Sequence, residues 1–140
     1  MEDFTTFICY ELKITMKKME KYLSQRLEEY GINFSQSLIL FCLLENDGCS
    51  LSEIGSRAQI ENSSLTTMVD KLEKEGLVER RADTHNRRIV RLFLTDRGRE
   101  LGERVHAAGV EFNRRLRQSL EGNEECLIKA LGTISRNLEK

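Results

Sequence analysis

Apolar residues recur at steps of three and four along the first thirty positions, a spacing that predicts one long amphipathic helix. Gly31 ends that helix. Asn33 and Gln36 then have the spacing of a capping box, which predicts the start of a second helix. Residues 38–44 of the second helix are apolar on almost every side, so we expect it to lie at the centre of the core. The stripe of the first helix comprises Phe4, Ile8, Leu12, Met16, Met19, Leu23 and Leu27.

The next two segments have the order of a helix-turn-helix motif. Ser50 and Glu53 repeat the capping box, and a short helix follows with Ile54 and Ala58 facing inward. A polar break at residues 59–63 leads into a longer helix that Gly76 ends. A short helix, a tight turn and a longer helix are typical of this DNA-binding motif. The expected inward positions of the longer helix are Leu65, Met68 or Val69, and Leu72.

After the longer helix the apolar period changes. Short runs with β-branched members at residues 77–80 and 89–94 predict a β-hairpin. Residues 81–88 between them are polar apart from Ala82, so we expect this tip to project into solvent as a wing. The sequence thus predicts a mainly α fold with a small β-hairpin wing, an α+β winged helix-turn-helix. Two more amphipathic helices follow, with stripes at Leu101, Val105, Ala108, Phe112, Leu116 and Leu120, and at Leu127, Leu131, Ile134 and Leu138.

The helices outside the winged unit carry more apolar surface than that unit can cover. A second copy would bury the same stripes twice. It would also place two recognition helices ~34–36 Å apart, which is one turn of DNA. We therefore expect an obligate two-fold homodimer on a palindromic site, whereas the alternative is a monomer in which these helices form a bundle. As a single domain over residues 1–140, the chain would comprise a winged helix-turn-helix DNA-binding unit at 33–98 and a helical dimerisation region at 1–30 and 99–140.

Composition narrows the class of protein. Charged residues make up 32% of the 140 positions and hydrophobic ones 39%, which suits a helix-rich globule. No apolar run reaches the ~18 residues of a membrane span, and no secretory signal is visible, so we expect a cytoplasmic protein without a membrane partner. The four cysteines lack CxxC or zinc spacing, and His85 and His106 are isolated, so we expect neither metal nor cofactor. No motif of a catalytic site is present, and we do not expect an enzyme.

Candidate DNA-binding residues crowd the beginning of the longer motif helix. Short polar side chains there can reach base edges or phosphates, and the helix N-terminus adds free amides and a partial positive charge. The alternative is that Asn62 and Ser63 only cap the helix. Five such residues together favour contact with the groove. They are Asn62, Ser63, Ser64, Thr66 and Thr67.

The predicted wing is strongly basic although the net charge of the chain is only −1. Residues 80–91 hold five arginines and one acid, Asp83. The charge of Arg81, Arg87 and Arg88 must therefore meet solvent or an anion, and a narrow minor groove is such an anion. The alternative is an ordinary solvated face. Each neutralised phosphate contributes about −0.9 to the salt slope, so DNA binding should weaken steeply as salt rises.

Residues 64–80, SLTTMVDKLEKEGLVER, are followed by Asp83, by Arg87 and Arg88, and by LTDRG at 94–98. With this combination the chain resembles the MarR (multiple antibiotic resistance regulator) family over nearly its whole length. The resemblance implies a dimer held by the first, fifth and sixth helices. It also implies contacts to DNA from the recognition helix and insertion of Arg88 into the minor groove. The recognition-helix contacts would lie near Asn62, Ser64 and Thr67, and Lys71 on the same helix joins the candidates.

The wing departs from the family's pattern. The family commonly has Asp-Pro-x-Asp-x-Arg, whereas this chain has DTHNRR at 83–88, without the proline and the second acid. Asp83 and Asn86 are the candidate wing supports, and Asn86 stands where the family has a carboxylate that would orient Arg88.

The resemblance also implies a signal, because members typically release DNA when a small anionic aromatic molecule binds or a cysteine is oxidised. Cys9 resembles the reactive cysteine of the organic-hydroperoxide-sensing branch. Lys13 and Leu23 replace the tyrosines expected around it, and a nearby lysine would favour the reactive thiolate. The alternative is that Cys9 is a small buried hydrophobic residue, as we expect for Cys42.

The sequence therefore predicts a sequence-specific double-stranded DNA-binding transcriptional regulator, in this family more often a repressor. It would bind a palindromic operator and be released by a small-molecule or oxidative signal. The alternative is a winged-helix protein-interaction module without DNA binding.

Overall fold

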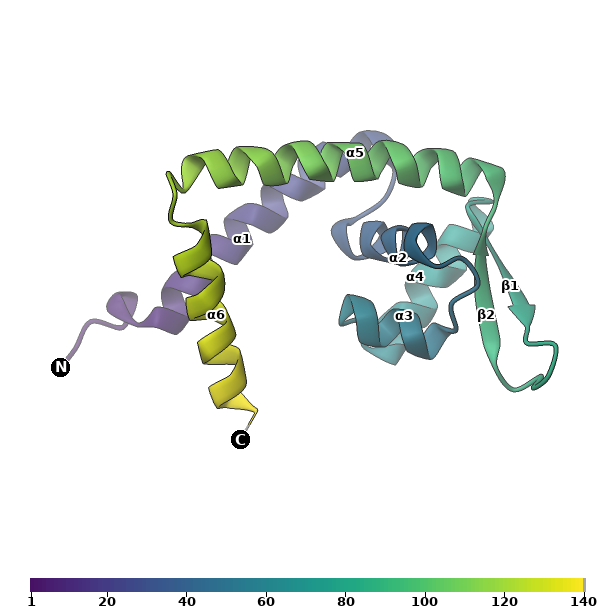
Figure 1. Ribbon diagram of the computed structural model, residues 1–140, viewed down its shortest axis with the longest axis horizontal. Helices are drawn as coiled ribbons and strands as arrows, with labels where there is room; N and C mark the ends of the chain where they lie inside the picture. The colour runs from purple at the N-terminus through teal and green to yellow at the C-terminus, as the bar shows by residue number, and fades with distance from the viewer. Residues whose placement is uncertain (140) are drawn as a thin grey trace. The chain divides into compact units, whose positions relative to one another are not determined.

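The structure is a computed structural model that describes residues 1–139 (Figure 1). The chain divides into two compact units, one of residues 1–105 and one that begins at His106, and each is described by itself. The second unit holds the end of α5 (Asp96–Ser119) and α6 (Glu124–Leu138). The first unit holds η1 (Phe4–Thr6), α1 (Ile8–Leu27), η2 (Glu28–Tyr30), α2 (Phe34–Glu45), α3 (Leu51–Ala58), α4 (Asn62–Lys74), β1 (Val78–Ala82), β2 (Val90–Leu94) and the start of α5.

Both predicted capping boxes are present at the starts of α2 and α3. The Asn33 side chain accepts a hydrogen bond from the Gln36 backbone at 2.8 Å, and the Gln36 side chain accepts one from the Asn33 backbone at 3.0 Å. Ser50 and Glu53 exchange the same two bonds at 3.1 and 3.3 Å. Each box satisfies amide groups that a helix start would otherwise leave unpaired, which explains why both helices begin where the sequence indicates.

The N-terminal segment differs from the single helix that its stripe predicts. Asp3 accepts a hydrogen bond from the Thr5 backbone and starts a single 3-10 turn, η1. Phe7 is extended, with φ −71° and ψ 139°, so the α-helical ladder begins only at Ile8. Phe4 therefore lies outside the helix, where its ring meets Tyr10 edge-on at 5.6 Å.

The core of the first unit is centred on α2, as predicted from its apolar surface. Ile39, Leu40 and Leu43 have no exposed surface, and they pack with buried side chains from α3, α4 and β2. The inward positions of α4 are Leu65, Val69 and Leu72, with Met68 only partly buried. This packing fixes which side of α4 turns outward, and the predicted fold class is confirmed.

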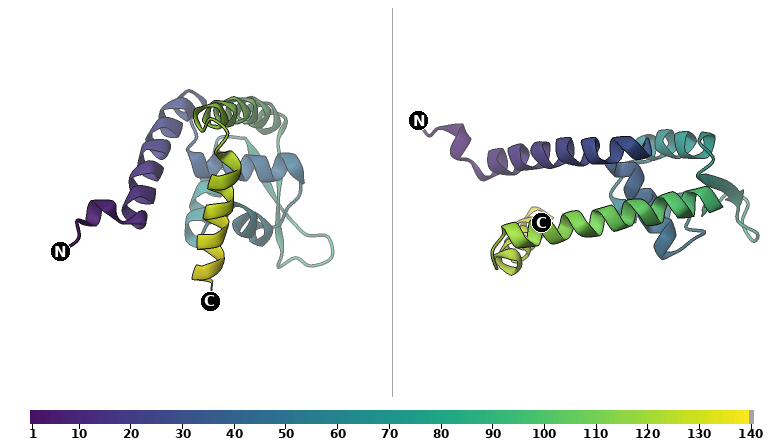
Figure 2. Two further views of the ribbon diagram at one scale, coloured as in Figure 1. Left: turned by 60° about the vertical axis from the view of Figure 1, so that its left-hand side comes forward. Right: turned by 90° about the horizontal axis from the view of Figure 1, so that it is seen from above.

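The first strand of the hairpin ends two residues later than predicted, at Ala82. β1 and β2 pair antiparallel from Val78 opposite Leu94 to Ala82 opposite Val90. Figures 1 and 2 show the connecting loop extending away from α2, α3 and α4, as expected of a wing. At the root of the hairpin, a Cβ on Gly98 would lie 1.8 Å from the Leu77 carbonyl oxygen, so only glycine fits where the first turn of α5 passes the residue before β1.

The apolar stripes of α1 and α6 stay largely uncovered. Among the described residues, α1 buries only Leu27 and α6 buries no side chain. Ile8 remains 69% exposed and Leu138 80% exposed. Within residues 1–139, no helix is both long enough and apolar enough to cross a membrane. The remaining exposed members of these stripes include Leu12, Met16, Leu127, Leu131 and Ile134.

Candidate DNA-binding surface

The start of α4 presents its polar side chains outward. The N-cap residue is Glu61, whose side chain makes no capping bond, so Asn62 and Ser63 are the first residues of the helix proper. The alternative in which these two residues only cap the helix is therefore wrong. Within residues 1–139, the side chains of Asn62, Ser63 and Ser64 make no hydrogen bond, and all three are exposed. Their hydroxyl and amide groups can donate to or accept from a ligand.

Two threonines on the same turn use their donors internally. Thr66 Oγ1 donates to the Asn62 carbonyl at 3.0 Å and Thr67 Oγ1 donates to the Ser63 carbonyl at 3.2 Å. Because each hydroxyl retains acceptor lone pairs and a methyl group, these side chains can accept from a base amine or contact a thymine methyl. They are poorer phosphate ligands than Ser63 and Ser64, which keep their donors.

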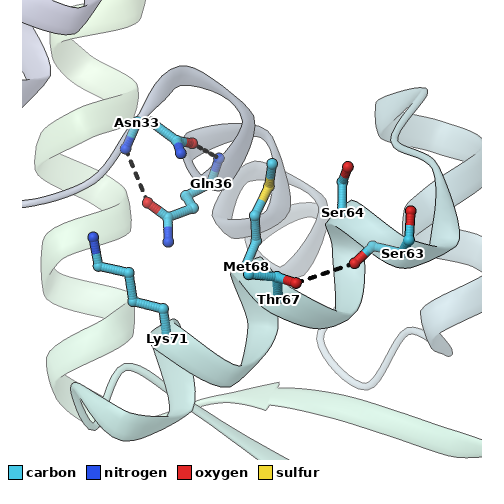
Figure 3. Close-up of a pocket in the computed structure, with 7 residues that line it drawn as sticks. All are labelled: Asn33, Gln36, Ser63, Ser64, Thr67, Met68 and Lys71. Carbon is cyan, nitrogen blue, oxygen red and sulfur yellow. Dashed lines mark hydrogen bonds between the residues drawn. The ribbon is translucent and has the colours of Figure 1, made fainter.

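A hollow of about 490 Å³ lies between the beginning of α2 and the outward side of α4. Figure 3 shows the Lys71 side chain extending from α4 toward the start of α2, where Gln36 lies. The Gln36 amide oxygen is engaged in its capping box, whereas its amide nitrogen points toward the hollow (Figure 3). The hollow is lined by Asn33, Gln36, Ser63, Ser64, Thr67, Met68 and Lys71. The structure thus brings four of the predicted site residues together with α2, an element that sequence reasoning did not include.

The tip of the wing is held by hydrogen bonds within its own loop. Asp83 Oδ2 accepts from the backbone N–H groups of His85 and Asn86, both at 3.0 Å. Asn86 Oδ1 accepts from the backbone N–H of Arg88 at 3.1 Å. The other Asp83 oxygen accepts from Arg91 Nε at 2.7 Å. The Arg91 bond, with the two backbone bonds, lowers the pKa of the Asp83 carboxyl from its ordinary value.

The arginines of the hairpin are not equivalent. Arg80 pairs with Asp70 and Glu73 of α4, and Arg81 donates to Glu79 at 2.9 Å while its guanidinium lies 4.4 Å from the Phe93 ring centre. The partner of Arg81 lies outside the tip, on the same strand, so the expectation that the charge of Arg81 must meet solvent or an anion is wrong for this arginine. Arg87 and Arg88 are exposed, and within residues 1–139 their side chains have no acidic partner. The free positive charge is therefore concentrated on those two residues.

The cysteines divide into two exposed and two buried residues. Cys9 on α1 is exposed, so the alternative of a buried Cys9 is wrong for the single chain. Cys42 is buried as predicted, and Cys49 is buried beside it. Burial raises the pKa of both the Cys42 and the Cys49 thiol, which keeps them protonated.

Comparison with known proteins places this geometry in a family. The MarR family model matches residues 32–90. The regulator YhbI of Bacillus subtilis, described as HTH-type, is 30% identical over 88% of this chain and 80% of its own length. The HTH-type transcriptional repressor MdtR of Bacillus subtilis is 31% identical over 62% of this chain and 56% of its own. The chain thus spans about half the length of some of the curated relatives it matches.

Solved structures agree over nearly the full chain. The transcriptional repressor CouR, bound to a DNA duplex, superimposes with a TM-score of 0.84 at 25% identity, covering 96% of this chain and 99% of that one. Reduced AbfR bound to DNA gives 0.79 at 25% identity, covering 95% and 92%. PcaV from Streptomyces coelicolor, in complex with its natural ligand, gives 0.85 over 100% and 99%, but at 20% identity it supports the fold alone. The resemblance inferred from the recognition helix and wing is therefore confirmed, and the chain belongs to the MarR family of HTH-type transcriptional regulators.

Proposed function

We propose that the protein is a transcriptional regulator that binds double-stranded DNA as a two-fold dimer. The observation that carries this proposal is that one compact unit presents a helix start with three unengaged polar side chains and a wing with two unpaired arginines. The DNA complexes of CouR and AbfR support it, because both have this fold at 25% identity.

The start of α4 enters the major groove in this proposal. Asn62, Ser63 and Ser64 contact base edges or phosphates, and Thr66 and Thr67 add acceptors and methyl groups. Lys71 and the amide nitrogen of Gln36 flank the hollow beside the helix, which suits a backbone phosphate at the edge of the groove. The positive N-terminal end of the α4 dipole also favours a negatively charged phosphate.

The wing supplies the second contact. Arg87 and Arg88 approach the minor groove, where a narrow A·T-rich segment concentrates negative potential. Asn86 holds the Arg88 backbone through its 3.1 Å bond and so stands in for the acid of the family's pattern. Arg81 contributes less, because Glu79 already neutralises part of its charge.

The uncovered stripes of α1 and α6 form the dimer interface in this proposal. A two-fold axis buries each stripe twice, which favours a symmetric pair over a monomeric bundle. Residues 33–98 then act as the winged DNA-binding unit, and residues 1–30 and 99–140 as the helical dimerisation region. Repression is the proposed sign of regulation, because MdtR and CouR are both transcriptional repressors.

A small anionic molecule or an oxidant would release the DNA. PcaV is known in complex with its natural ligand, and AbfR is known in reduced and overoxidised forms that are both bound to DNA, so ligand binding and oxidation each occur in proteins of this fold. For oxidation the candidate is Cys9, whose thiol is exposed on α1. The test is treatment with an organic hydroperoxide: Cys9→Ser should keep its DNA, and release equal to that of the unaltered protein would exclude Cys9 as the sensor.

The DNA-binding proposal is tested by fluorescence anisotropy on a duplex that the protein itself selects from a randomised pool, hereafter the selected duplex. Arg88→Ala should weaken binding by about 1–3 kcal/mol and flatten the salt dependence. Arg57→Ala is the control, because Arg57 pairs with Glu45 at 3.0 Å on the surface of α3 and belongs neither to the proposed contact residues nor to the proposed dimerisation region. If the unaltered protein selects no sequence and binds no duplex at low salt, the interaction-module alternative replaces this proposal.

A further inference from the structure

Arg91 on β2 is bound to three other parts of the first unit. Its Nε donates to Asp83 at the base of the wing tip at 2.7 Å. Its Nη1 donates to the Gly48 carbonyl in the loop before α3 at 3.1 Å and lies 3.5 Å from the Glu53 carboxylate in the first turn of α3. The guanidinium therefore links the wing to the helix-turn-helix.

The backbone around Arg91 is tied to the same loop. Leu92 donates to the Cys49 carbonyl at 2.9 Å, and Gly48 donates to the Leu92 carbonyl at 3.0 Å. Ser50 forms an isolated antiparallel bridge with Arg91. The backbone bonds fix the position of the Arg91 main chain, and the side-chain bonds fix the position of its guanidinium. The Arg91 side chain is therefore held at both ends.

From Arg91 the hydrogen bonds continue without a gap to the wing tip. One Asp83 oxygen accepts from Arg91, and the other accepts from the His85 and Asn86 amides. Asn86 in turn accepts from the backbone N–H of Arg88. Five residues thus join the first turn of α3 to the backbone that carries the exposed Arg88 guanidinium.

The charge of Arg91 is already satisfied, in contrast with that of Arg88. Asp83 and Glu53 both lie within ion-pair distance, and the Arg91 side chain is only 34% exposed. A guanidinium engaged in this way has few donors left for a phosphate. The Arg91 guanidinium is therefore better suited to holding the Asp83 carboxylate in place than to binding DNA.

We propose that Arg91 is a positioning residue, which fixes the wing tip, and with it Arg88, at a set place relative to the recognition helix. The inference rests on the proposed DNA-binding function. It explains how this chain orients Arg88 although its wing lacks the second acid of the family's pattern. Arg91 holds Asp83, Asp83 accepts from the Asn86 backbone, and the Asn86 side chain accepts from the Arg88 backbone.

The first test is Arg91→Ala on the selected duplex. Affinity should fall about tenfold, because Arg88 must then be ordered on binding, while the slope of log affinity against log salt stays as in the unaltered protein. Arg91→Lys should recover only part of the loss, since one ammonium cannot reproduce the planar fork that bonds Asp83 and Gly48 together. Arg80→Ala is the matched control on the opposite strand, because Arg80 pairs with Asp70 and Glu73 and leaves the tip bonds intact.

The second test is amide hydrogen exchange in the free protein. In Arg91→Ala, the amides of His85, Asn86 and Arg88 should exchange faster, while those of α2 keep their protection. Asp83→Asn should give the same pattern without touching the bond to Gly48, and so covers the case in which Arg91→Ala folds poorly. The affinity losses of Asp83→Asn and Arg91→Ala should not add in the double variant.

Three results would overturn the proposal. A salt slope reduced in Arg91→Ala as much as in Arg88→Ala would make Arg91 a direct phosphate ligand. Additive losses would mean that it does not act through Asp83. Unchanged exchange at the tip would mean that the tip does not depend on it. Because exchange is measured without DNA, it separates this failure from failure of the proposed function, which would show as an unaltered protein that binds no duplex.

Discussion

The winged unit and the terminal helices use the same hydrophobic spacing with opposite results. Along α4, Val69 and Leu72 are completely buried within the chain, whereas along α6 Leu131 is 38% exposed and Leu138 80% exposed. Both stripes predict a helix, and both helices are present. The difference shows that spacing identifies a face that must be covered, but not whether the cover lies in the same chain.

The largest expected effect comes from opening the closed core. Leu43→Ala should lower the free energy of unfolding by about 2–5 kcal/mol, because it leaves a cavity in the centre of the winged unit. Urea denaturation followed by circular dichroism measures this loss, and the loss should not depend on protein concentration. A cost below about 1 kcal/mol would mean that the core around α2 relaxes to fill the space.

The matching change on the open stripe is Leu131→Ala. If a second copy covers α6, each protomer loses about 1 kcal/mol of burial, and the symmetric interface loses it twice. The dissociation constant of the dimer should then rise by about tenfold or more. Sedimentation equilibrium measures it, with Leu43→Ala as the control that weakens the fold instead. An unaltered protein that stays monomeric at every accessible concentration would contradict the hypothesis that a second copy covers the apolar stripe of α6.

The cysteines test the same contrast chemically, with a smaller effect. Cys42 and Cys49 belong to the closed core, and burial raises the pKa of both thiols, so they should react with iodoacetamide at least about tenfold more slowly than Cys9 and Cys126. Mass spectrometry of partly alkylated protein gives the four rates. The urea-denatured chain is the control, in which all four should react alike. Equal rates in the folded protein would mean that the core opens freely.

The smallest effect concerns the pH dependence of stability. The pKa of Asp83 is lowered in the folded chain, mainly by its bond from Arg91, so ionised Asp83 favours folding. This contribution is present above the ordinary value of 3.8 and is lost as pH falls below it, through the lowered folded value. Asp83→Asn should therefore lose stability less steeply on acidification below 3.8. Melting curves across that interval measure the difference, and parallel curves for the two proteins would contradict it.

Sequence reasoning located the elements well because their starts and ends are local. The boxes at Asn33 and Ser50 and the turn at Gly76 depend on residues no more than a few positions away. Partners distant in the sequence could not be found in this way. Arg91 contacts Gly48 across 43 positions, and Gln36 reaches the side of α4 only through packing of the core. Arg91 also lies directly opposite Arg81 in the strand register, a pairing that only the folded hairpin shows.

The outward stripes of α1 and α6 share no residue with the helix start and the arginines proposed to read DNA. Mutations in the two surfaces should therefore differ in whether they are dominant or recessive. If these stripes form the dimer interface as proposed, then in a cell with two alleles a chain altered only at Arg88 would still pair with normal copies and disable half of each mixed dimer, so the defect would be dominant. An allele that lacks α6 would find no companion to disable, and its defect would be recessive.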